Sequence, residues 1–244
     1  MTNLLAPLLA GAILAAPQGA AACFEADPAL IWSACAEARA DLVLLPEDAG
    51  ATPLDAIDVT GAYTATDTRK EGRPKPVGLF VRRGEVVSRE YARFDGLLLI
   101  DREGRPSIQH RHRAEIGGRV YDLDDASARA TFIEVASKSS VSLLQSHLLI
   151  AEGAVDAKPL ADAPRFRRRI LFVTEAGAMG LWDSGLAALT LNEAAEMLAA
   201  KYRPRMALNL DMGSYDFCRT GDQLCGLLPP EQTGKLSNLL RLWR

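Results

Sequence analysis

Three pairs of short apolar runs, each joined by a glycine-containing turn, constrain the fold of this chain more than any other feature. The pairs lie in residues 79–87, 97–109 and 170–182. Such runs, rich in β-forming residues, predict antiparallel hairpins because the turn brings the second run back beside the first. A Gly-Gly pair in residues 116–120 predicts a further turn. We therefore expect a mixed, largely antiparallel sheet.

Helical signals occur in two other parts of the chain. Asp27 precedes a proline, which is typical of a helix start, and apolar residues then recur at helical spacing, so a helix is predicted over 28–40. Thr190 and Glu193 have the spacing of a capping box, which predicts a helix that ends before Pro204. With the hairpins, these helices predict an α+β fold: a mixed, largely antiparallel sheet with several hairpins and packed helices.

The length of 244 residues is sufficient for one globular domain with a sizeable core. We expect a single domain over residues 23–244. Short strands are predicted at 43–45 and 206–210. The last stretch, 229–244, begins with two prolines and ends in an amphipathic run, which we interpret as a docked C-terminal tail rather than a membrane anchor.

The first residues resemble a secretory signal. An apolar run from Leu4 to Ala16 is followed by Pro17, Gly19 and small residues suited to cleavage, so residues 1–22 are predicted to be a signal peptide. The run is too short to span a bilayer comfortably, so no membrane span is predicted. We expect a periplasmic or secreted protein. Lipid anchoring at Cys23 is the less favoured alternative.

The four cysteines form two pairs by position: Cys23 with Cys35, and Cys218 with Cys225. An even number of cysteines after an export signal favours two local disulfides, although four cysteines permit three connectivities. Their spacing does not match a zinc site.

Charge gives little indication of a macromolecular partner. The net charge is -3, and the arginines near residues 111–113 and 165–169 are not interleaved with aromatic residues. This pattern gives no reason to expect nucleic-acid binding. His110 and His112 would share one face of a strand and, with His147, could form a metal site. Their neighbours include several arginines that would repel a cation, so we predict no metal and no other cofactor.

The stretch ALNLDMGSYDF, residues 207–217, is the strongest candidate for chemistry. An apolar run ends on Asp211 and breaks at once into a turn around Gly213 and Ser214. A carboxylate at the end of a buried strand, beside a loop that permits close backbone approach, is a common place for a functional site.

Four segments together resemble the phosphodiester glycosidase family, whose members include the lysosomal enzyme that removes N-acetylglucosamine from a phosphodiester. They are VTGAYTATDTRKEGRPKPVGLFVRRGEV (59–86), QSHLLI (145–150), ILFVTEAG after Arg168 or Arg169, and LDMGSYD (210–216). The resemblance extends from about residue 55 to 217. The chain departs from the family pattern at Thr60, Ala62, His147, Leu148, Phe172, Met212, Tyr215 and Asp216.

The resemblance and the chemistry of the side chains imply roles for seven residues. Asp211 would stabilise an oxocarbenium-like centre, and Arg168 would hold the phosphate. The expected substrate contacts are Gln145, Ser146, Asn209, Gly213 and Ser214. A second carboxylate could come from Asp216, Glu175 or Asp67.

The leading hypothesis is an exported hydrolase that acts on, or at least binds, a sugar linked through phosphate, such as an envelope glycan or its precursor. The added side chains in the glycine-rich loop leave an alternative open. In that alternative, the chain is a catalytically degenerate glycan- or phosphate-binding protein, or a structural envelope protein, on the same fold.

Overall fold

The structure is a computed structural model that describes four stretches of the chain: residues 23–46, 50–65, 74–212 and 215–244. The predicted signal segment, 1–22, lies outside these stretches, and so do Gly213 and Ser214.

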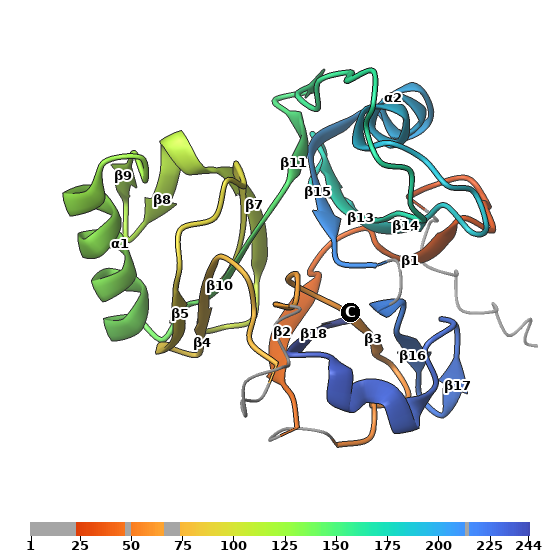
Figure 1. The fold of residues 1–244 in the computed structure, drawn as a ribbon, viewed down its shortest axis with the longest axis horizontal. Helices are drawn as coiled ribbons and strands as arrows, with labels where there is room; N and C mark the ends of the chain where they lie inside the picture. Colours follow the sequence, from red (N-terminus) through yellow and green to blue (C-terminus); the bar gives the residue numbers. More distant parts are fainter. Residues whose placement is uncertain (1–22, 47–49, 66–73, 213–214) are drawn as a thin grey trace, which may run out of the picture.

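Three antiparallel sheets make up most of the fold (Figure 1). Sheet I has the order β1-β14-β13-β15-β11-β12. Its strands are β1 (Leu30–Ala34), β11 (Leu148–Ala151), β12 (Ala154–Val155), β13 (Arg169–Thr174), β14 (Met179–Asp183) and β15 (Pro204–Leu210). Sheet II has the order β5-β4-β10-β6-β7. Its strands are β4 (Leu79–Arg82), β5 (Glu85–Arg89), β6 (Gly96–Ile100), β7 (Pro106–His110) and β10 (Ser142–Ser146).

Sheet III has the order β17-β16-β3-β18-β2. Its strands are β2 (Arg39–Leu44), β3 (Ile57–Thr60), β16 (Cys218–Thr220), β17 (Gln223–Leu224) and β18 (Asn238–Trp243). A small hairpin, β8 (Ala114–Ile116) with β9 (Arg119–Tyr121), follows the short 3-10 helix η1 (Arg111–Arg113). The C-terminal tail thus contributes a central strand, β18, which pairs with both β2 and β3.

One hydrophobic core is shared by the inner faces of all three sheets. Along β6, Leu98 and Ile100 belong to this shared core, whereas Leu97 and Leu99 pack on the opposite face. Successive side chains of a strand point to opposite faces, so a strand buried on both sides is apolar at every position. This is why β6 reads as the continuous apolar run GLLLI.

Each sheet has its own cover on the outer face (Figure 1). Helix α1 (Ala126–Lys138) packs on sheet II through Phe132 and Ile133, and helix α2 (Leu191–Tyr202) packs on sheet I through Leu198. The outer face of sheet III is covered by residues on either side of the 3-10 helix η3 (Pro230–Lys235).

The hairpins and the second helix are confirmed. The three predicted hairpins are β4–β5, β6–β7 and β13–β14, and the Gly-Gly turn joins β8 to β9. The capping box is present: the Thr190 side chain accepts from the Glu193 backbone N–H, and the Glu193 carboxylate accepts from the Thr190 N–H.

The predicted α+β class is wrong, because the fold is dominated by sheets that pack against one another. Helices α1 and α2 only cover outer faces and take no part in the shared core. All strand pairs between the described strands are antiparallel, so the sheets are not mixed.

The helix predicted over 28–40 is also wrong, since this segment forms β1 and the start of β2. The Asp27 side chain accepts a hydrogen bond from the Ala29 N–H at 3.0 Å, as a helix cap would. The chain then extends, because Leu30–Ala34 pairs with β14 and completes the edge of sheet I. Tertiary pairing here overrides a local helix-start signal.

Both predicted disulfides are present, Cys23–Cys35 and Cys218–Cys225. The Cys23 sulfur is therefore already bonded, which argues against lipidation at this position. Within the described residues, no helix combines the length and apolar character needed to cross a membrane.

Candidate functional site

Asp211 follows β15 directly and is almost completely buried, with 5% of its surface exposed. Its backbone N–H donates to the Gly61 carbonyl at 2.9 Å, and the Thr64 N–H donates to its carboxylate at 3.3 Å. The turn that follows β3 therefore faces the end of β15. A Cβ atom on Gly61 would lie 2.4 Å from Oδ1 of Asn238, so this turn can approach β18 closely only with glycine at that position.

The environment of Asp211 raises its pKa to about 7. Burial is the main cause, because it penalises the charged carboxylate, and backbone hydrogen bonds from Thr64 and Met212 oppose the shift. No Lys, Arg or His among the described residues forms an ion pair with this carboxylate. A carboxyl group with a pKa near neutrality can exchange a proton during a reaction, which is the property expected of an acid–base group.

Tyr63 is the side chain around which the site is organised. Its hydroxyl accepts a hydrogen bond from Nδ2 of Asn209 at 2.6 Å. Its ring stacks on Phe94, with centroids 5.2 Å apart, and contacts His147 edge-on at 5.9 Å. Phe94 and His147 contact each other at 4.6 Å. Sequence reasoning did not assign a role to Tyr63 or Phe94; the only available signal for Tyr63 was its place inside the VTGAY segment.

Arg168 lies close to this aromatic group. Its Nε donates to the Leu189 carbonyl at 2.9 Å and its Nη2 to the Pro164 carbonyl at 3.1 Å, which fixes the plane of the guanidinium. Its charge acts on Tyr63, where it lowers the pKa, and on His147, whose pKa is lowered chiefly by burial. Arg169 pairs with Leu210, so Arg168 and Asp211 lie at neighbouring strand ends, and Asn209 binds Tyr63 beside them.

Gln145 and Ser146 are fully buried and bonded to backbone. The Gln145 amide donates to the Ala92 and Phe94 carbonyls and accepts from the N–H groups of Leu79 and Ala92. These bonds fix the loop that carries Phe94 against β10. The Ser146 hydroxyl donates to the Asn209 carbonyl. The predicted contact of these two residues with substrate stays a prediction, while their observed contacts hold the site in place.

The candidates for a second carboxylate occupy other surroundings. Asp216 accepts from Arg169 and Arg167, and Arg169 also binds Asp183, so this carboxylate is tied into a buried ion-pair cluster. Glu175 is exposed, 4.0 Å from Arg205. Asp67 lies outside the described residues. Phe172, a departure from the family pattern, packs beneath α2 against Phe24 and Tyr202.

A cleft of about 500 Å³ adjoins the site at His147. It lies between the end of β7 and the start of β11, and its lining includes all three histidines of the chain, His110, His112 and His147. His112 is exposed and binds Asp122 at 2.9 Å, with Asp124 nearby. These groups form a hydrogen-bonded cluster on the surface.

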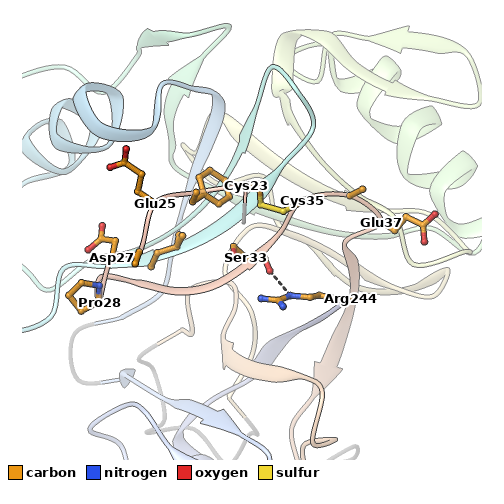
Figure 2. Close-up of a pocket in the computed structure, with 12 residues that line it drawn as sticks. Cys23, Glu25, Asp27, Pro28, Ser33, Cys35, Glu37 and Arg244 are labelled. Atoms are coloured by element: carbon orange, nitrogen blue, oxygen red, sulfur yellow. Dashed lines mark hydrogen bonds between the residues drawn. A yellow bond between two sulfur atoms is a disulfide. The ribbon is translucent and has the colours of Figure 1, made fainter. Parts of the chain in front are cut away.

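A larger cavity, about 940 Å³, lies at the N-terminal disulfide (Figure 2). It is lined by the segment from Cys23 to Glu37 and by Arg244, whose Nε donates to the Ser33 carbonyl at 2.6 Å. None of the predicted catalytic or substrate-binding residues contributes to this lining. Cavity size therefore does not locate the candidate site.

Two solved structures share this fold. One is the zebrafish N-acetylglucosamine-1-phosphodiester alpha-N-acetylglucosaminidase catalytic domain, auto-inhibited by its pro-peptide: the TM-score is 0.54 at 12% identity over 84% of this chain and 73% of that one. The other is a hypothetical protein from Synechocystis, with a TM-score of 0.51 at 14% identity over 85% of this chain and 57% of that one. No sequence-family model and no curated protein matches the chain. The likeness shows a shared fold, not family membership.

Proposed function

We propose that this chain is an exported hydrolase that cleaves the bond between a sugar and a phosphate group in a phosphodiester. The observation that carries the proposal is the raised pKa of Asp211, about 7, at a strand end where Asn209 and Arg168 also meet. The fold shared with the zebrafish enzyme, which by name acts on such a phosphodiester, supports the same substrate class.

In the proposed reaction, the bond between the anomeric carbon and the bridging oxygen breaks. The electron pair stays on the bridging oxygen, so negative charge develops on the departing phosphate, which Arg168 stabilises. The Asp211 carboxylate stabilises the positive charge that forms on the sugar and takes the proton of the water that adds to the anomeric carbon. Asn209 helps to position these groups through its hydrogen bond to Tyr63. Gly213 and Ser214, which lie outside the described residues, are proposed contacts of the sugar and the phosphate.

A second candidate is a binding protein for sugar phosphates that does not turn them over. The burial of Met212, a departure from the family pattern, favours this alternative, since its side chain occupies space that glycine would leave open. Tight binding without turnover would support it.

We further propose that residues 23–244 form the mature protein, as a single domain in a periplasmic or secreted location. Two disulfides support an oxidising compartment. The proposed partner is a small phosphate-linked sugar, such as an envelope glycan or its precursor.

The test is hydrolysis of N-acetylglucosamine 1-phosphomethyl ester and glucose 1-phosphomethyl ester by residues 23–244. We expect Asp211→Asn to lower kcat about 10²- to 10³-fold at pH 7, because it removes the proton acceptor and the charge that stabilises the transition state. Asp222→Asn, at an exposed aspartate, is the matched control and should keep full activity. Equal rates for Asp211→Asn and the wild type would exclude the catalytic assignment.

A further inference from the structure

The hydrogen bond between Asn209 and Tyr63 has a defined direction. Nδ2 of Asn209 lies 2.9 Å from the Leu210 carbonyl, which can only accept, so this atom is the amide nitrogen and not the amide oxygen. The same nitrogen donates its second hydrogen to the Tyr63 hydroxyl oxygen at 2.6 Å. The hydroxyl oxygen is therefore an acceptor here, and its own proton is directed elsewhere.

No acceptor for that proton lies within hydrogen-bonding distance among the described residues. The Tyr63 hydroxyl is thus a donor that the folded chain leaves for another molecule. Packing fixes the ring in place, since it stacks on Phe94 and meets His147 edge-on. A donor held in this way needs little reorganisation to meet a ligand oxygen.

The position of the hydroxyl indicates which oxygen it would meet. Asp211 and Arg168 both act on it electrostatically, with opposite effects: Asp211 raises its pKa and Arg168 lowers it. With burial, the result is a pKa of about 12, so the group keeps its proton at neutral pH. The hydroxyl binds Asn209, two residues before Asp211, and Arg168 directly precedes the position that pairs with Leu210. A sugar held at Asp211 and a phosphate held at Arg168 would therefore bring the bridging oxygen close to this donor.

We propose that Tyr63 donates a hydrogen bond to the bridging oxygen of the phosphate-linked sugar, and that Asn209 is the positioning residue that directs this donor. The inference rests on the proposed function. As the bond from the anomeric carbon to the bridging oxygen breaks, that oxygen gains charge and the hydrogen bond strengthens. Tyr63 keeps its proton, and water supplies the hydroxyl that completes the sugar product.

The test compares Tyr63→Phe, Asn209→Ala and the double variant on N-acetylglucosamine 1-phosphomethyl ester. Tyr63→Phe keeps the ring contacts and removes only the donor. We expect kcat to fall about 10²-fold with KM within about threefold, because the bond strengthens in the transition state. Since Asn209 acts through Tyr63, the double variant should lose little more than Tyr63→Phe alone. Tyr91→Phe, which removes the hydroxyl of another tyrosine, one that donates to Asp124 outside the proposed site, is the control and should retain most of kcat.

The outcomes separate this inference from the proposed function. If the wild type turns over and Tyr63→Phe stays within threefold of it, or if the two single losses simply multiply, the inference is wrong and the function stands. If the wild type does not turn over, the hydrolase proposal fails, and calorimetric titration with N-acetylglucosamine 1-phosphate decides the contact. About tenfold weaker binding to Tyr63→Phe supports the contact. Equal affinity, or no binding to the wild type, overturns it.

Discussion

Asp211 and Asp216 are two buried carboxylates in one short segment, and the groups that bind them differ. Asp216, 1% exposed, binds Arg169 at 2.7 Å and Arg167, and it accepts from the Leu227 N–H at 3.0 Å. Asp211, 5% exposed, receives only backbone hydrogen bonds from the residues that the structure describes, and burial raises its pKa to about 7.

The difference separates a structural carboxylate from a chemically competent one. Removing one partner from a buried ion pair is strongly destabilising, so the pairs of Asp216 with Arg167 and Arg169 contribute to the structure. A buried carboxyl group with no cationic partner is destabilising in its charged form, and sites of this kind are frequently functional. These surroundings support the proposal that Asp211, and not Asp216, takes part in the reaction.

Removal of Arg169 should give the largest effect on stability. Arg169 is fully buried and binds both Asp183 and Asp216, so Arg169→Met would leave two buried carboxylates short of a partner. We expect a loss of about 3–5 kcal/mol in the free energy of unfolding, measured by urea denaturation at pH 7. Arg102→Met removes an exposed ion pair and is the control, with little expected change. A loss below about 1 kcal/mol for Arg169→Met would contradict the structural assignment.

Asp211→Asn should stabilise the protein at high pH, the reverse of an ordinary buried substitution. The folded pKa, about 7, lies above the unfolded value of 3.8, so the folded state binds more protons between these values and stability falls as pH rises through this window. Asparagine does not titrate. We expect the variant to exceed the wild type by about 3–4 kcal/mol at pH 8 and by little at pH 4.

Denaturation of both proteins at several pH values between 4 and 8 checks this prediction. The same comparison with Asp222→Asn, an exposed aspartate, should give a difference that hardly depends on pH. A constant difference for Asp211→Asn would mean that Asp211 titrates normally, and the contrast with Asp216 would disappear.

The Cys218–Cys225 disulfide allows a third test of the contrast between Asp211 and Asp216. It links the two ends of the β16–β17 hairpin, which begins just after Asp216. The two cysteines are 7 residues apart, so replacing both by serine should lower stability by about 2–3 kcal/mol through the larger entropy of the unfolded chain. If the Asp216 region is scaffold, kcat of the folded variant should stay within about threefold. A large loss of kcat with an unchanged melting temperature would place this region in the chemistry.

The local signals of the sequence predicted the hairpins and α2 because these depend on nearby residues. The turn of β4–β5 and the capping box at Thr190 need only a few positions to be recognised. The helix predicted over 28–40 was wrong because the strand that pairs with this segment, β14, lies far along the chain. Helix α1 was missed although Asp125 caps it, because its apolar face, Phe132, Ile133 and Ala136, is narrow.

The site could be predicted only in part, for a related reason. Asp211 and Asn209 share one strand end, which the sequence displays. Tyr63 and Phe94 come from loops whose meeting depends on the three-sheet packing and on four hydrogen bonds of Gln145. No spacing in the sequence predicts the contact between Tyr63 and Phe94, so only the structure reveals it.

Thr60 gives the smallest and most local test of the contrast between the two carboxylates. Its buried hydroxyl donates to the Tyr215 carbonyl and accepts from the Phe217 N–H, so it anchors the residues on either side of Asp216. Thr60→Val keeps the shape and removes these two hydrogen bonds, while the Phe217 N–H still donates to the Tyr215 carbonyl at 2.8 Å. We expect a loss of about 1 kcal/mol, measured by urea denaturation. Thr60→Ser keeps the hydroxyl and serves as the control.

Measurement of kcat shows whether the hydrogen bonds of Thr60 support only the structure or also catalysis. If the Asp216 segment is scaffold, Thr60→Val should leave kcat near that of Thr60→Ser, because Asp211 is held separately by Gly61 and Thr64. A tenfold fall in kcat with only a small change in stability would show that the position of the Asp216 segment controls the chemistry. The two carboxylates would then belong to one functional unit, because a change made at the Asp216 segment would have altered the reaction at Asp211.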